Sequence, residues 1–160
     1  EILADNTVEE LKHIHAVYDL AKEQGDITDS SYEALEKRWK DENAERSEKV
    51  EKGEVIYGLK EYTFQLYLDY EISTLKEKYC NDTNREGMKL TEDEIQEHYQ
   101  SREWIFGDSD ENADLEMARI AVERELREQK YDDMITQRET GSQVAGNMEN
   151  VNRITLKNIQ

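Results

Sequence analysis

Apolar residues recur at helical spacing along most of the chain, three or four positions apart and separated by polar residues. A stripe of this period indicates an amphipathic helix with one face on a core. The segment 59–79 has two such stripes on opposed sides, which is typical of a helix packed between neighbours, so we expect it to be the central helix. The pattern predicts helices over residues 7–24, 30–52, 59–79, 91–104 and 115–138.

Local signals at the predicted helix starts support these boundaries. In a capping box, a Ser or Thr oxygen and a Glu carboxylate three residues later each accept a hydrogen bond from a free backbone N–H. The required spacing occurs three times, at Thr7 and Glu10, at Ser30 and Glu33, and at Thr91 and Glu94. The capping box therefore gives Glu94 a structural role at the start of a helix, and this role takes precedence over a catalytic one.

Glycine and proline usage favours a helical fold as well. The 160 residues contain no proline and seven glycines, and long helices need both to be scarce in their interiors. We predict an all-α, multi-helix fold with long central and C-terminal helices, in a single domain over 1–160. Near the C-terminus, Ile154, Leu156 and Ile159 alternate with polar residues, which favours a short extended tail within 144–160.

Charge limits the classes of partner. The chain has 39 acidic and 21 basic residues and a net charge of −18. Nucleic acids and anionic membrane surfaces require clustered Lys and Arg, so neither is an expected partner. The sequence also contains no apolar run of membrane-spanning length, and we expect no membrane insertion by this chain.

The residues that usually carry chemistry do not form a recognisable site. His13 and His15 are two positions apart, which puts them on nearly opposite sides of a helix, and His98 has only Glu94 and Arg102 at helical spacing. Cys80 is the single cysteine and is expected to be a small packing residue near a helix end. No nucleophile motif, phosphate-binding loop or zinc spacing is present, so we predict no catalytic residue, metal or cofactor.

One stretch resembles a known family. Residues 89–106, "KLTEDEIQEHYQSREWIF", are similar to the N-terminal chaperone region of SurA- and PrsA-type extracytoplasmic foldases, with matches at Thr91, Glu94, Ile95, Tyr99 and Phe106. The later segment "LEMARIAVERELREQKYDDMI" resembles a second helix of that family. The matching positions there are Val122, Leu126, Lys130, Tyr131 and Ile135.

The resemblance covers most of residues 30–160 but departs from the family in one respect. The full foldases carry a parvulin-type prolyl isomerase domain between these two helices, whereas only "GDSDENAD" separates Phe106 from Leu115 here. A segment of that length is far too short for a domain. The resemblance therefore implies the chaperone fold without the isomerase.

The function implied by the resemblance is a non-enzymatic chaperone that binds unfolded or extended polypeptides in a groove between helices. Aromatic and aliphatic side chains would supply affinity and an acidic rim would keep the complex soluble. For most aromatic residues of the middle helices, a place in the core is the commoner outcome. The candidates for peptide contact are Tyr62, Leu66, Tyr67, Tyr70, Trp104 and Phe106.

Two alternatives stay open. By family association the chain could be a peptidyl-prolyl cis-trans isomerase, although its catalytic domain is missing. It could also be a structural or assembly module for a partner protein or a homodimer, and the sequence does not determine the oligomeric state. The resemblance further implies an extracytoplasmic lipoprotein of a Gram-positive bacterium whose leader has been removed.

Overall fold

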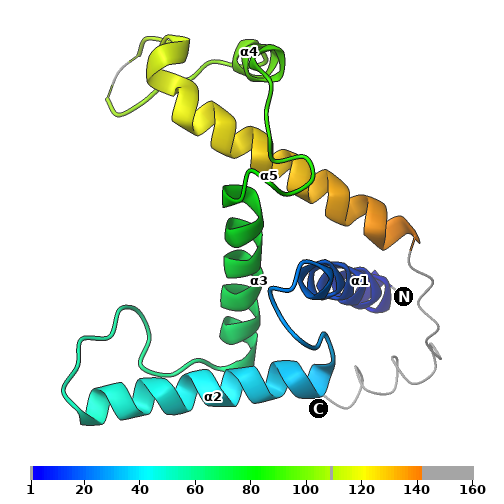
Figure 1. The fold of residues 1–160 in the computed structure, drawn as a ribbon, viewed down its shortest axis with the longest axis vertical. Coiled ribbons are helices and arrows are strands. Elements are labelled where there is room, and N and C mark those ends of the chain that lie inside the picture. The colour runs from blue at the N-terminus through cyan, green and yellow to red at the C-terminus, as the bar shows by residue number, and fades with distance from the viewer. Residues whose placement is uncertain (1, 109, 142–160) are drawn as a thin grey trace. The chain divides into compact units, whose positions relative to one another are not determined.

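The computed structural model describes residues 2–108 and 110–141, and of the side chains those from Val8 onward (Figure 1). This part of the chain is all-helical and contains no strand, which confirms the predicted fold class. Its five helices are α1 (Ile2–Glu23), α2 (Tyr32–Glu51), α3 (Phe64–Asn81), α4 (Glu92–Gln100) and α5 (Leu115–Gly141). The predicted extended tail within 144–160 lies outside the described residues.

The helix starts agree with the sequence signals in one case of three. Thr91 and Glu94 form the expected capping box at the start of α4. The prediction that a helix begins at Thr7 was wrong, because α1 already begins at Ile2. The cap of α2 is Ser31 rather than Ser30, and its side chain accepts a hydrogen bond from the Ala34 N–H.

The start of α3 differs more, because the first five residues of the predicted central helix belong to a loop. The guanidinium of Arg46 in α2 donates hydrogen bonds to the carbonyls of Tyr57 and Leu59, at 3.2 and 2.7 Å. The side-chain amide of Asn43 both donates to and accepts from the backbone of Tyr62, at 2.9 and 2.8 Å. These side-chain bonds to α2 hold the loop backbone in a non-helical path, so α3 begins only at Phe64.

The chain divides into two compact units. Unit 1 runs to Leu75 and includes the chain from Arg138, and unit 2 is Lys76–Gln137. The boundaries fall inside α3 and α5, so each of these helices contributes to both units. Whether the chain folds as the single predicted domain is not tested by this division and stays a prediction.

A buried carboxylate joins α1, α2 and α3 in unit 1. Glu71 on α3 is 9% exposed and accepts hydrogen bonds from the hydroxyls of Tyr18 at 2.6 Å and Tyr67 at 2.9 Å. It also accepts from the Arg38 guanidinium of α2 at 2.7 Å. Burial, reinforced by the Glu71 carboxylate, raises the pKa of Tyr18 and of Tyr67 well above the ordinary value. Both phenols therefore stay protonated and keep donating to Glu71.

The core of unit 2 lies between α4 and the first half of α5. Ile95, Trp104, Ala118 and Val122 form a buried cluster, and Leu90 packs against it. The Trp104 indole N–H donates to the carbonyl of Tyr99 at 3.1 Å, which satisfies its polar atom inside the core. Beyond this cluster, the buried rings of Tyr79 and Tyr131 lie 5.3 Å apart.

Candidate functional site

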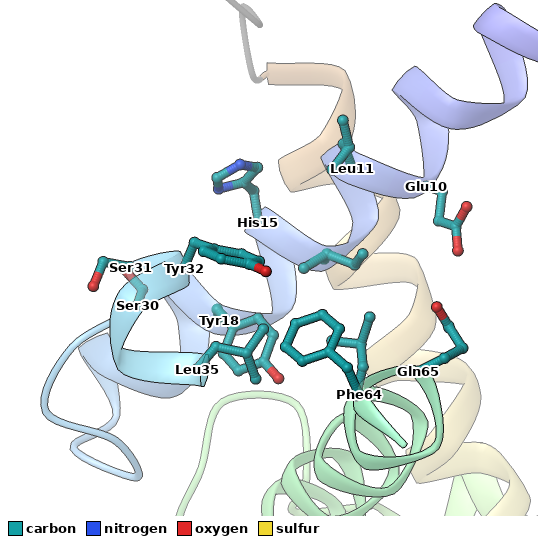
Figure 2. Close-up of a pocket in the computed structure, with 12 residues that line it drawn as sticks. Glu10, Leu11, His15, Tyr18, Ser30, Ser31, Tyr32, Leu35, Phe64 and Gln65 are labelled. Atoms are coloured by element: carbon teal, nitrogen blue, oxygen red, sulfur yellow. The ribbon is translucent and has the colours of Figure 1, made fainter. Parts of the chain in front are cut away.

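An apolar cavity opens on unit 1 where α1, the start of α2 and the start of α3 meet. Its volume is about 290 Å³. Leu35 of α2 and Tyr18 of α1 lie on its inner side, and both are buried. Figure 2 shows the Tyr18, Leu35 and Phe64 side chains converging, with the Glu10 carboxylate at the edge. The apolar residues of the lining are Leu11, Ile14, Tyr18, Tyr32, Leu35, Phe64 and Leu68.

The mouth of this cavity leaves apolar surface open to solvent. Leu11 is 39% exposed and Tyr32 is 62% exposed. The ring of Tyr32 lies 5.6 Å from that of Phe64, and Phe64 in turn packs edge-on against Trp39 at 5.5 Å. These contacts hold the two rings at the mouth in place. A preformed apolar hollow with aromatic walls suits a bulky apolar side chain of another protein.

The residues predicted from the sequence to bind peptides lie elsewhere in unit 1. Tyr62, Tyr67 and Tyr70 form an aromatic cluster, in which the rings of Tyr62 and Tyr70 are stacked at 5.2 Å. Tyr70 and Leu66 are 42% and 45% exposed, whereas Tyr67 is 6% exposed. None of these four lines the cavity. Their role in peptide binding stays a prediction.

Trp104 and Phe106, the other two candidates, lie in unit 2 and differ sharply in exposure. Trp104 is 3% exposed and is part of the core cluster, whereas Phe106 is 42% exposed. Burial leaves Trp104 little surface to offer a partner. Phe106 retains that surface, and its predicted role is likewise untested.

Sequence reasoning did not identify the cavity. Leu11, Ile14 and Tyr18 lie at helical spacing within the predicted helix 7–24, and an apolar stripe of this kind is ordinarily interpreted as core. Whether a stripe is fully covered depends on how the neighbouring helices end. Here α2 begins at Tyr32 and α3 begins at Phe64, and both of these residues line the cavity. No local sequence signal reports that geometry.

The polar groups of the described residues do not suggest catalysis. His13 binds Glu139 at 2.7 Å, and His98 lies 3.4 Å from Glu125 with its ring against Trp104. Within 2–108 and 110–141 no cluster of three or more His, Cys, Asp or Glu side chains could hold a metal ion. In the same part of the chain, none of the helices is long and apolar enough to cross a bilayer.

The single cysteine has the packing role predicted for it. Cys80 lies near the end of α3 and is 5% exposed. Burial raises the pKa of its thiol to about 11. The thiol is therefore protonated at neutral pH, a form that is a poor nucleophile.

Comparison with known proteins gives one relative by sequence, and no protein-family model matches the chain. The chaperone for lacto-N-biosidase of Bifidobacterium longum subsp. longum is 31% identical over 136 residues. The match covers 85% of this chain and 49% of the relative, so the chain spans about half the length of the curated protein that it matches.

Comparison of folds gives a glycosidase. The crystal structure of the GH136 lacto-N-biosidase from Eubacterium ramulus, in its native and selenomethionine forms, matches with a TM-score of 0.70 at 19% identity. The match covers 89% of this chain and 28% of the glycosidase chain. At this identity the likeness shows that the fold is shared.

These findings correct the family resemblance drawn from the sequence. The resemblance to SurA- and PrsA-type chaperones was wrong, because the matches by sequence and by fold lead to a lacto-N-biosidase chaperone and a lacto-N-biosidase instead. The resemblance rested on a capping box and on apolar spacing, which many unrelated helical proteins share. The isomerase alternative and the lipoprotein location rested on the same resemblance, and the location is untested. The chain is similar to a chaperone for lacto-N-biosidase and shares its fold with part of a lacto-N-biosidase.

Proposed function

We propose that this chain is a non-enzymatic folding or assembly module for a glycoside hydrolase of the lacto-N-biosidase kind. The observation that carries the proposal is the 31% identity to a chaperone for lacto-N-biosidase over 85% of the chain. An assembly role for a protein partner was one of the alternatives open from the sequence. We now prefer it to general capture of unfolded polypeptides.

The shared fold supports the same proposal. A helical region with this fold accounts for about a quarter of the Eubacterium ramulus lacto-N-biosidase chain. In that protein the region and the rest of the glycosidase are covalently joined, which suits a module that works in lasting contact with a glycosidase. A separate chain with the same fold would make that contact as a subunit or as a chaperone.

The cavity of unit 1 supplies a physical means of association. In this proposal an apolar side chain of the glycosidase enters the cavity and covers Leu11 and Tyr32 at its mouth. Removing apolar surface from water contributes about 25 cal/mol per Å². Aromatic-walled pockets that receive one side chain are frequent centres of binding energy in protein interfaces.

The proposal is tested by refolding. Denatured Bifidobacterium longum lacto-N-biosidase is diluted into buffer with this chain, with its bifidobacterial relative, or with neither, and recovered hydrolytic activity is measured. We expect this chain to raise the recovered activity several-fold. An unrelated aggregation-prone protein, refolded in parallel, should gain nothing. The proposal would be contradicted if the bifidobacterial relative restores glycosidase activity and this chain does not. If this chain raises the recovery of the unrelated protein equally, a general chaperone would be favoured instead.

A further inference from the structure

Helix α5 of unit 2 has a second apolar face that the core does not use. Met117, Ile120 and Arg124 follow i, i+3, i+7 spacing along one side of the helix. Ala121 lies beside them, and it is half-buried because it packs against the core cluster. Met117 is 71% exposed and Ile120 is 84% exposed. Two large apolar side chains this open to water, adjacent on one helix face, are unusual on a protein that acts alone.

The opposite side of the same helix already supplies the core. Ala118 and Val122 are fully buried in the cluster with Ile95 and Trp104. Met117 and Ile120 therefore lie on a different side of α5 from the residues that form the core. They form an additional surface, and the folding of unit 2 does not account for it.

The connection between α4 and α5 extends this surface. Ile105 and Phe106 are 51% and 42% exposed, and they line a hollow of about 410 Å³ together with Ala121 and Arg124 of α5. We call the surface formed by Ile105, Phe106, Met117, Ile120 and Ala121 the α5 face. It combines one aromatic and three large aliphatic or thioether side chains with a shallow hollow, a mixture favoured at protein interfaces.

The charges around the α5 face are mostly acidic. Arg102, Arg119 and Arg124 also border it, and each of them is ion-paired with a glutamate. From Glu103 to Glu116 the chain contains six acidic residues and no lysine or arginine. The whole chain carries a net charge of −18. Opposing two copies of this face in a symmetric dimer would bring acidic rim against acidic rim, which is unfavourable. Charge complementarity instead requires a partner surface whose apolar centre is bordered by Lys and Arg.

We infer that the α5 face is a docking surface for the glycosidase partner, and that it receives an apolar patch bordered by basic residues. This assignment rests on the proposed function and deepens it by naming the surface and the chemistry of the contact. The apolar side chains exclude water at the centre of the contact. The acidic rim speeds encounter with the basic border and orients the two proteins.

The test compares two lysine substitutions on α5. Ile120→Lys places a positive charge at the apolar centre of the α5 face, where the apolar patch of the partner would remove it from water without a counter-charge. Gln129→Lys makes the same final residue at an exposed position of α5 outside that face. Binding of each purified variant to Bifidobacterium longum lacto-N-biosidase is measured by titration. We expect Ile120→Lys to weaken binding about tenfold or more, and Gln129→Lys to change it less than about twofold.

Further measurements separate the possible failures. Thermal unfolding checks that both variants fold, and Met117→Ala, a simple truncation, should also weaken binding. If the wild-type chain binds the glycosidase and both Ile120→Lys and Met117→Ala bind it equally well, the α5 face is not the docking surface. The proposed function would then still stand. No binding by the wild-type chain would overturn the proposed function and the assignment with it. A wild-type dimer that Ile120→Lys dissociates in light scattering would show a second copy to be the occupant and would also overturn it.

Discussion

At the scale of single residues, Glu71 connects α1, α2 and α3 within unit 1. Its carboxylate accepts hydrogen bonds from two tyrosine hydroxyls and from a guanidinium. Tyr18 and Arg38 donate from α1 and α2, so each of these helices is held to α3 by a directional contact, while Tyr67 donates from α3 itself. The apolar cavity lies among the same helices, and Tyr18 belongs to both arrangements.

Removing this carboxylate should strongly destabilise unit 1. Glu71→Ala leaves two buried phenol hydroxyls and the half-buried Arg38 guanidinium without their shared acceptor, and we expect a loss of about 2–4 kcal/mol in the free energy of unfolding. Glu77→Ala, an exposed glutamate of the same helix, should change it by about 0.5 kcal/mol or less. Urea denaturation measures both, and equal effects would contradict the role given to Glu71.

Glu94 should make the start of α4 sensitive to acid. Lys130, together with the backbone N–H and the hydroxyl of Thr91, lowers the pKa of Glu94 from its ordinary 4.5 to about 2. A carboxyl whose pKa is lowered on folding stabilises the protein above its unfolded pKa, and this contribution is lost as pH falls from about 4.5 to about 2. Because the side chain is 38% exposed, solvent limits the contribution to about 1 kcal/mol.

The measurement is urea denaturation of Glu94→Ala and of the wild type at pH 7 and near pH 2. We expect the variant to be less stable by about 1 kcal/mol at pH 7, and the difference to shrink at low pH. Glu97→Ala, on an exposed position of the same helix, serves as the control. A stability difference that is the same at both pH values would rule out the titration of Glu94 as its cause.

At the scale of elements, the loop between α2 and α3 depends on side chains of α2. Arg46 donates to two loop carbonyls and lies over the ring of Tyr62, with its guanidinium carbon 4.6 Å from the ring centre. Within the loop, Val55 and Tyr57 are 76% and 87% exposed, so apolar burial contributes little there. The hydrogen bonds from α2 are the main constraint on this backbone.

Arg46→Ala should therefore loosen the loop without unfolding α2. We expect chymotrypsin to cut after Tyr57 several-fold faster in the variant, because cleavage requires local opening of the backbone. Lys40→Ala removes an exposed ion pair from the same helix and should leave the cleavage rate unchanged. Identical cleavage of Arg46→Ala and the wild type would show that other contacts hold the loop.

These elements also show what the sequence could predict. The helical period, the scarcity of glycine and the absence of proline sufficed for the all-α fold, and the Thr91–Glu94 spacing located the start of α4. The start of α3 was missed, because the apolar stripe from Leu59 continues the α3 pattern through the loop. Thr63 is a local signal that sequence reasoning passed over, since its hydroxyl accepts a hydrogen bond from the Leu66 N–H at the start of α3. The contacts of Arg46 and Asn43 with the loop backbone lie many residues away, and no local pattern predicts them.

At the scale of the whole molecule, the candidate surfaces follow from tertiary structure rather than from motifs. The unit 1 cavity depends on where three helices end, and the α5 face depends on which of two apolar stripes the core takes. The sequence predicted Phe106 as a contact residue, and it belongs to the α5 face. Leu11, Tyr32 and Ile120 were not predicted.

The cavity of unit 1 can be tested at its mouth. Leu11→Gln replaces an apolar side chain by a polar one of similar size, and we expect it to reduce the recovery of glycosidase activity several-fold. Since Leu11 is partly exposed, the free energy of unfolding should fall by about 1 kcal/mol or less. Lys22→Gln, an exposed position of α1 outside the cavity, should retain full recovery. Full recovery with Leu11→Gln would remove the cavity from the binding surface.

The most direct test of the partner-specific role is co-expression in a host that lacks both proteins. Bifidobacterium longum lacto-N-biosidase is produced alone, with this chain, or with its bifidobacterial relative, and the soluble hydrolytic activity per cell is compared. We expect this chain to raise soluble activity several-fold over that of the glycosidase alone. The partner-specific role would be contradicted if the bifidobacterial relative raises the soluble activity and this chain does not raise it above that of the glycosidase alone.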